Sequence, residues 1–181
     1  MEILRQKFES LRDLYINELR NLFSAETQLV EALPKMANGA TTPALKQAFT
    51  DHLGETRVHV ERLEHIFKDL SKEAIGEMCE AIKALIREAE RYIKSEGNDD
   101  IRDAALIGAA QRIEHYKIAA YGTARALASR LSDTGAADCL QKILNEEGAV
   151  DHKLTSIAEN SVNVNAGMPA KTKSEFDVSI F

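Results

Sequence analysis

Residues 11–34 read LRDLYINELRNLFSAETQLVEALP, and this stretch decides the fold class. Apolar side chains recur in it at steps of three and four residues, the spacing that places them on one face of an α-helix. These residues are Leu11, Tyr15, Leu19, Leu22, Leu29 and Leu33. Glu26 falls on the same face. We predict a helix over about residues 10–37, which bends or tightens at Pro34 because proline lacks a backbone donor, and which stops at Asn38-Gly39.

A second helix follows closely. It begins at Thr42-Pro43, because Thr is a favourable N-cap and Pro is well tolerated at the first helical position. It runs to about residue 70, and its buried face carries Leu45, Phe49, His52, Glu55, Thr56, His59 and Leu63. Only a few residues separate the two helices, so we expect them to be antiparallel neighbours.

The rest of the chain repeats this arrangement after a long connection. Residues 71–98 have a helical pattern and link the first pair of helices to a second pair, which begins at Asp99 or Asp100 and is broken at 132–135. A pair, a long crossover and a second pair are typical of ferritin-like folds. We therefore predict an all-α, antiparallel four-helix bundle over residues 1–160. Residues 161–181 have no sustained period and are expected to form an irregular tail.

Composition excludes several classes of function. Charged residues make up 29% of the chain and the net charge is −6, whereas a nucleic-acid-binding surface needs concentrated Lys and Arg. No apolar run approaches the length of a membrane span, and the N-terminus does not resemble a signal peptide. Cys79 and Cys139 belong to no Cys/His cluster. We expect a cytoplasmic protein with neither nucleic acid nor membrane as partner.

Each of the four long helices carries a glutamate near the middle of its apolar face: Glu26, Glu55, Glu114 and Glu147. A buried carboxylate requires a cation, a hydrogen-bond partner or a proton. Glu55 is followed four residues later by His59, and Glu147 by Asp151. Each helix pair therefore has one lone glutamate and one glutamate with a second donor a turn away. We predict that the four glutamates converge on one interior site.

Carboxylates with an imidazole suit two iron or manganese ions. The usual di-iron motif is Glu-x-x-His, with a three-residue step, whereas His59 and Asp151 lie four residues after their glutamates. His52, three residues before Glu55, is a competing ligand. The alternatives are a core histidine bonded to a carboxylate at His59 and an ordinary salt bridge at Asp151.

Four segments carry a resemblance to a known family: LFSAETQLVEALPKMA (22–37), QAFTDHLGETRVHVERLEHIF (47–67), RDAALIGAAQRIEHYKIAAYGT (102–123) and LNEEGAVDHKLTSIAE (144–159). Together they resemble the bacterial YciF/YciE stress-protein family of ferritin-like proteins, over residues 8–162. The resemblance implies a bundle related to rubrerythrin, a homodimer, a link to bacterial stress responses and a binuclear metal site. It places the four glutamates at the family's carboxylate positions and Asp151 at an acidic position, and His52 fits its pattern.

Three functions remain open at this point. The first is a redox enzyme whose two-metal centre reacts with peroxide or oxygen. The second is a protein that binds or oxidises iron without turning over an organic substrate. The third is a structural or interaction module that keeps the bundle without the chemistry.

Overall fold

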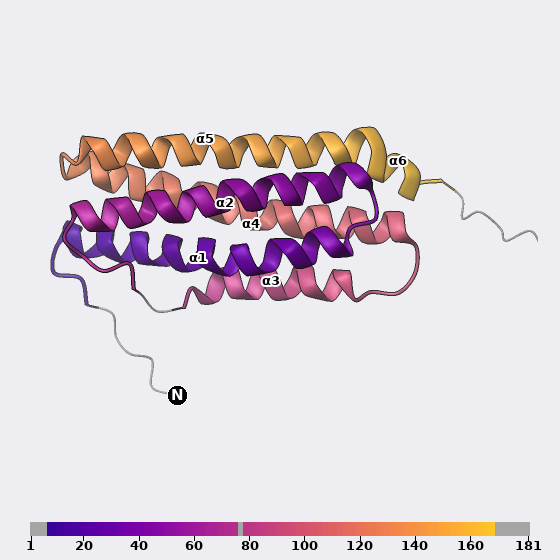
Figure 1. Ribbon diagram of the computed structural model, residues 1–181, viewed down its shortest axis with the longest axis horizontal. Coiled ribbons are helices and arrows are strands. Elements are labelled where there is room, and N and C mark those ends of the chain that lie inside the picture. Colours follow the sequence, from indigo (N-terminus) through magenta and orange to yellow (C-terminus); the bar gives the residue numbers. More distant parts are fainter. Residues whose placement is uncertain (1–6, 76–77, 169–181) are drawn as a thin grey trace, which may run out of the picture.

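The computed structural model describes residues 7–75 and 78–168, whose regular elements are all helical (Figure 1). The long helices are α1 (Leu11–Gly39), α2 (Pro43–Asp69), α4 (Asp99–Arg130) and α5 (Thr134–Ile157), and the shorter α3 (Glu80–Ile93) lies between the two pairs in sequence. A π-helix over Ala158–Val162 and a final turn, α6 (Asn163–Ala166), extend α5.

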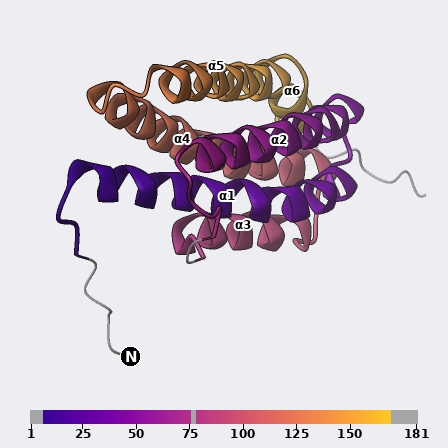
Figure 2. The ribbon, with the colours of Figure 1, turned by 60° about the vertical axis from the view of Figure 1, so that its left-hand side comes forward.

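The four long helices lie side by side, and each runs antiparallel to its neighbours in the bundle (Figure 1). α1 pairs with α2 and α4 pairs with α5, each through a short turn. α3 packs outside the bundle against α1 and α4, and carries the chain from the first pair to the second (Figure 2). The predicted all-α bundle with a helical crossover is confirmed.

The N-terminus of α2 is capped from another helix. Thr42 holds the N-cap position, as predicted, but its side chain makes no capping hydrogen bond. The backbone N–H groups of Thr41 and Thr42 instead donate to the carboxylate of Asp103 in α4, at 3.0 and 2.6 Å. Burial by itself raises the pKa of Asp103, but these hydrogen bonds outweigh it and hold the pKa below its ordinary value. This contact joins the two helix pairs at one end of the bundle.

The C-terminus of α1 lies at the Asn38-Gly39 stop that the sequence predicts. α1 continues through Pro34 and ends at Gly39. Gly39 faces α3 closely, because a Cβ atom there would lie 2.8 Å from side-chain carbons of Ile93. The missing side chain at this position therefore allows the end of the crossover helix to pack on α1.

The apolar core of the bundle consists of two clusters. One contains Leu29, Leu33, Phe49, Leu106, Ile113 and Leu154, and the other contains Tyr15, Leu22, Leu63, Tyr121, Leu140 and Ile143, among further residues. Along every long helix, the members of one cluster lie before the mid-helix polar residues and the members of the other lie after them, except that Ala25 of the first cluster directly precedes Glu26. A polar layer therefore separates two halves of the core.

The C-terminal segment departs from the prediction. Residues 161–166 are helical, not irregular, and Val162 is fully buried against the first apolar cluster. The rest of the expected tail, residues 169–181, lies outside the described residues.

Among the described residues, no helix has both the length and the hydrophobicity that a membrane span requires.

Candidate metal centre

The polar layer in the middle of the bundle is built by all four long helices. It contains seven buried polar side chains: Glu26 from α1, His52, Thr56 and His59 from α2, Glu114 and Lys117 from α4, and Glu147 from α5. None of the seven exposes more than 2% of its surface. Because unpaired buried charges are costly, their contacts with one another decide whether this layer is stable.

Glu26, His59 and Glu147 form the first of two groups whose donor atoms lie within 4.8 Å of one another. Nδ1 of His59 lies 2.9 Å from Oε1 of Glu147 and 3.7 Å from Oε1 of Glu26. The hydroxyl of Tyr121 donates a hydrogen bond to Oε1 of Glu26 at 2.7 Å. We call Glu26, His59 and Glu147 the His59 group.

The second set, which we call the His52 group, consists of His52, Glu114 and Glu147. Nε2 of His52 lies 3.2 Å from Oε1 of Glu114 and 3.8 Å from Oε2 of Glu147. Glu147 belongs to both groups and offers one oxygen to each histidine. Glu147 is therefore the one carboxylate that the two groups share.

The ammonium of Lys117 lies among the same carboxylates. Nζ is 2.7 Å from Oε1 of Glu147, 3.4 Å from Oε2 of Glu26 and 3.6 Å from Oε2 of Glu114. It is also 3.3 Å from Nε2 of His52. Lys117 is fully buried, so its charge is compensated inside the protein by these three carboxylates.

Burial and charge act in opposite directions on the titrating groups of this layer. Burial lowers the pKa of His52, but Glu114 and Glu55 outweigh it and raise that pKa to about 9. Burial likewise lowers the pKa of His59, and Glu147 and Glu26 raise it to about 9. Burial raises the pKa of Glu114, but Lys117 and His52 bring it down to about 2. Without a metal, the charged forms of all these groups therefore stabilise one another at neutral pH.

Each histidine also contacts a carboxylate at the rim of the layer. Nδ1 of His52 lies 3.3 Å from Oε2 of Glu55, and Nε2 of His59 lies 3.0 Å from Oε2 of Glu146. Glu146 also pairs with Arg62. Such outer partners fix the orientation of a metal-binding imidazole and tune its basicity.

The two histidines are also the points at which the layer approaches the surface. His59 lines a surface cavity of about 420 Å³ together with Glu55, Arg62 and Glu146. His52 lines a smaller one of about 100 Å³, which Glu55 also borders. Both cavities lie between α2 and α5. This side of the bundle is therefore where solvent comes nearest to the two buried histidines, with half-exposed Glu55 at the mouth of both cavities.

The structure brings together only some of the residues predicted from the sequence. Glu26, His59, Glu114 and Glu147 lie in the two groups. The side chain of Glu55 is 48% exposed, because it lies at the edge of the buried stripe of α2, and it reaches the layer only through His52. Asp151 accepts a hydrogen bond from Gln111 at 3.1 Å and lies 3.5 Å from Nε2 of His115. Glu55 and Asp151 as metal ligands remain predictions.

Two interior residues enter the site in addition to the predicted set. His52, a competing ligand in the sequence analysis, belongs to one of the two groups. Lys117 is absent from the predicted set, because the apolar pattern of this helix predicts a buried stripe through Glu114, Ile118 and Tyr121, whereas Ile118 is only partly buried. The signal available was the spacing Glu114-x-x-Lys117, which puts Lys117 at the position that His takes in the usual di-iron motif.

The donor set fits a divalent cation. Two imidazoles and three carboxylates are ligands that iron and manganese accept. Among the described residues, four atoms of the His59 group have no hydrogen-bond partner: Oε2 of Glu26, Nδ1 of His59 and both carboxylate oxygens of Glu147. Oε1 of Glu147 still has close neighbours, since Nζ of Lys117 lies 2.7 Å and Nδ1 of His59 lies 2.9 Å from it. Buried polar atoms without partners are unfavourable, and a bound cation would satisfy them.

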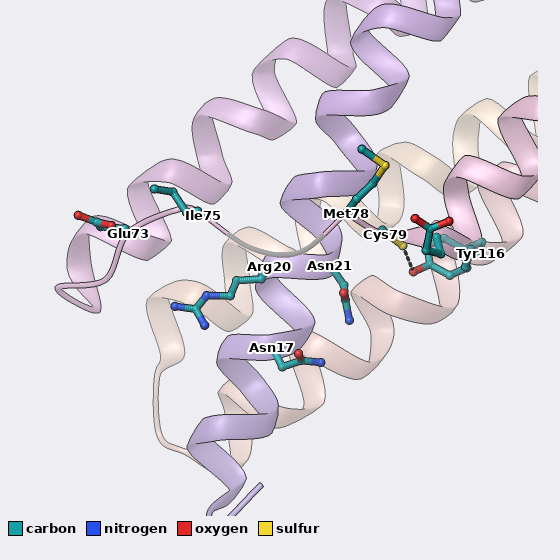
Figure 3. Close-up of a pocket in the computed structure, with 10 residues that line it drawn as sticks. Asn17, Arg20, Asn21, Glu73, Ile75, Met78, Cys79 and Tyr116 are labelled. Carbon is teal, nitrogen blue, oxygen red and sulfur yellow. Dashed lines mark hydrogen bonds between the residues drawn. The ribbon is translucent and has the colours of Figure 1, made fainter. Parts of the chain in front are cut away.

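A larger surface cavity, of about 700 Å³, lies away from this layer (Figure 3). Asn17, Arg20 and Asn21 of α1 line it, together with residues that precede α3. At its edge Sγ of Cys79 lies 3.0 Å from the hydroxyl of Tyr116. The cavity includes none of the residues of the two metal-ligand groups, so we assign it no part in the candidate centre.

Comparison with known proteins agrees with the fold. The model of a family described as a domain of unknown function (DUF892) matches residues 10–167. Protein YciF of Escherichia coli strain K12 is 43% identical over 159 residues, which cover 87% of this chain and 96% of that protein.

Solved structures extend this comparison. The crystal structure of the Escherichia coli stress protein YciF matches with a TM-score of 0.83 and 41% identity, covering 86% of this chain and 99% of that one. A Rhodopseudomonas palustris protein, provisionally described as structural, matches with a TM-score of 0.82 and 38% identity over the same shares. An Anabaena variabilis protein with a ferritin-like domain matches with a TM-score of 0.57 and 16% identity, over 95% of this chain and 42% of that one. This last match supports the ferritin-like fold alone.

Proposed function

The chain belongs to the DUF892 family, and from this premise we propose that it is a ferritin-like protein that binds divalent iron or manganese inside its helical bundle. The observation that carries the proposal is the pair of buried His/carboxylate groups that share Glu147. Residues of the His59 group and the His52 group would hold the metal. Glu55, half-exposed at the mouth between α2 and α5, would attract cations toward His52.

The sequence predicts two ions that act on peroxide or oxygen, or that take part in iron handling, and we propose this redox role for the bound metal. Iron or manganese would supply a redox-active Lewis acid at this position. The residues of the chain contribute the rest: His59 connects Glu147 to Glu146 at the rim, and Tyr121 orients Glu26. A small oxidant would arrive through the cavity that His59 lines.

A structural bundle without turnover is the second candidate, and Lys117 favours it. One ammonium and two protonated imidazoles neutralise the three buried carboxylates without any metal. In this version the polar layer fixes the register of the four helices, and the protein serves as an interaction module.

Metal analysis separates the two candidates. The purified protein is dialysed against Fe²⁺ under anaerobic conditions or against Mn²⁺, and bound metal is measured by elemental analysis while thermal unfolding is followed by circular dichroism. We expect bound metal and a raised melting temperature. Glu147→Gln should lose both, and Glu61→Gln, a change on the exposed face of α2, should keep both. Absence of bound metal together with an unchanged melting temperature would refute the metal proposal and support the structural one.

The redox role needs its own measurement. Metal-loaded protein should consume hydrogen peroxide faster than an equal concentration of free metal ion. Equal rates would refute the peroxide activity while leaving metal binding in place.

We further propose that the protein is a homodimer, as the resemblance to its family implies, and that it is cytoplasmic, as predicted from its composition. Analytical ultracentrifugation of the full chain should give twice the monomer mass of 20.1 kDa. A large closed assembly would instead support iron storage in a cage.

A further inference from the structure

We propose that the ammonium of Lys117 takes the place of one of the two cations of a ferritin-like centre, so that the interior binds one divalent ion, at the His59 group. This inference rests on the proposed metal binding and adds to it the number of ions and their position. It departs from the two ions that the sequence predicts.

The position of Lys117 is the first argument. Its Nζ contacts every member of the His52 group: Nε2 of His52 at 3.3 Å, Oε2 of Glu114 at 3.6 Å and Oε1 of Glu147 at 2.7 Å. A cation bound by the same three residues would have to occupy the space in which the ammonium lies. The ammonium therefore competes directly with a metal ion at the His52 group.

The ammonium of Lys117 competes less directly with a metal ion at the His59 group. Lys117 contacts Glu26 and Glu147 there, but among the described residues no ion pair or hydrogen bond joins it to His59. Nδ1 of His59 faces Oε1 of both carboxylates, and the Tyr121 hydroxyl donates a hydrogen bond to Oε1 of Glu26. Both groups contain carboxylate oxygens without hydrogen-bond partners among the described residues, but only the His59 group has an imidazole that Lys117 does not contact, which leaves it as the position for a metal ion.

Burial of Lys117 is the second argument. Long basic side chains usually extend their charged ends to water. Lys117 is fully buried, and its neighbours one turn away along α4 are the buried Glu114 and Tyr121. Its ammonium therefore stays in the layer as a fixed cation.

Charge balance is the third argument. Glu26, Glu114 and Glu147 supply three negative charges. One ammonium and one divalent ion cancel them when both imidazoles are neutral, the form in which histidine binds metal. A second divalent ion would leave an excess of two positive charges in a buried layer, which is strongly unfavourable.

The test counts metal ions in the wild type and in two variants at Lys117. Lys117→Glu supplies a fourth buried carboxylate, so two divalent ions would then be balanced. Lys117→Gln removes the cation without adding a charge. Lys35→Gln is the matched control, because Lys35 is an exposed lysine that pairs with Glu90. Each full-length protein is titrated with Mn²⁺, and the stoichiometry is measured by equilibrium dialysis and by anomalous scattering from crystals at the manganese edge.

We expect about one ion per chain in the wild type and in Lys35→Gln, located at Glu26, His59 and Glu147, and about two ions in Lys117→Glu. Lys117→Gln should bind its first ion roughly tenfold more tightly or better, because a like charge a few ångströms away is gone. If Lys117→Glu does not fold, the wild-type stoichiometry and the metal affinity of Lys117→Gln still show whether Lys117 replaces one of the two cations.

The outcomes distinguish the two proposals. Two ions in the wild type would overturn the inference about Lys117 and leave the proposed metal binding intact. One ion located at the His52 group, or unchanged affinity in Lys117→Gln, would also overturn it. No bound ion in any of the four proteins would overturn the proposed function itself.

Discussion

Replacement of Lys117 by methionine in the metal-free protein is expected to cost about 3–5 kcal/mol of unfolding free energy, the loss usual when one partner of a buried ion pair is removed. Methionine matches the length of the lysine stem, so the change mainly removes a charge. The prediction concerns the polar layer alone, and it holds whether or not the protein binds metal.

The magnitude follows from the distances around Nζ. At an effective dielectric constant of about 20, the attraction between Lys117 and Glu147 across 2.7 Å is about 6 kcal/mol. Glu26 and Glu114, at 3.4 and 3.6 Å, add about 5 kcal/mol each. Repulsion from a protonated His52 at 3.3 Å removes about 5 kcal/mol, and desolvation of the ammonium removes several more. The loss is further limited because a carboxylate can take up a proton when the lysine is absent.

That proton uptake gives the prediction a pH signature. In Lys117→Met one buried carboxylate should have a folded pKa above its unfolded value. The stability that its protonated form contributes to the variant is therefore lost as pH rises through the folded pKa. The difference between the variant and the wild type should therefore be smaller at pH 5 than at pH 8.

Urea unfolding followed by circular dichroism measures both the loss of unfolding free energy in Lys117→Met and its dependence on pH. Lys35→Met is the control, and because Lys35 forms an exposed pair with Glu90, it should cost less than about 1 kcal/mol. Adding Glu147→Gln to Lys117→Met should cost less than the sum of the two single changes, because the second change removes a charge that the first left unpaired. A loss below about 1 kcal/mol in Lys117→Met, with no dependence on pH, would refute the placement of its ammonium among the carboxylates.

Two further predictions concern pH and helix capping. His52 and His59 have folded pKa values of about 9, above the ordinary 6.5, so the stabilisation that their charged forms give to the metal-free protein is complete below about pH 6.5 and is lost as pH rises through 9. Urea unfolding between pH 6 and 10 should show this decline, and a flat profile would contradict the paired imidazoliums. Asp103→Asn should lower the unfolding free energy by about 1–3 kcal/mol, because a buried charged acceptor of the α2 N-terminus becomes neutral. Asp100→Asn, in the first turn of α4, is the control. It should change the unfolding free energy by less than about 0.5 kcal/mol in the same urea unfolding experiment.

Sequence alone determined the order and approximate bounds of the four long helices. The three- and four-residue steps of apolar side chains in residues 11–34 required a helix with one buried face, and the short joint at Thr42-Pro43 required an antiparallel partner. The same periodicity placed Glu26, His59, Glu114 and Glu147 on buried faces, where the structure has them. These features depend on the spacing of nearby residues, which can be read directly from the sequence.

Tertiary structure decided which side chains meet. α4 contacts α1, α3 and α5, so it is covered on more than one side and buries side chains beyond the stripe that carries Glu114. For that reason the pattern could not choose between Ile118 and Lys117 as the inward residue. Glu55 lies at the edge of the stripe of α2, where the gap toward α5 leaves it half-exposed. A carboxylate count can thus be made from sequence, whereas the cation that balances the carboxylates depends on the rotation and packing of whole helices.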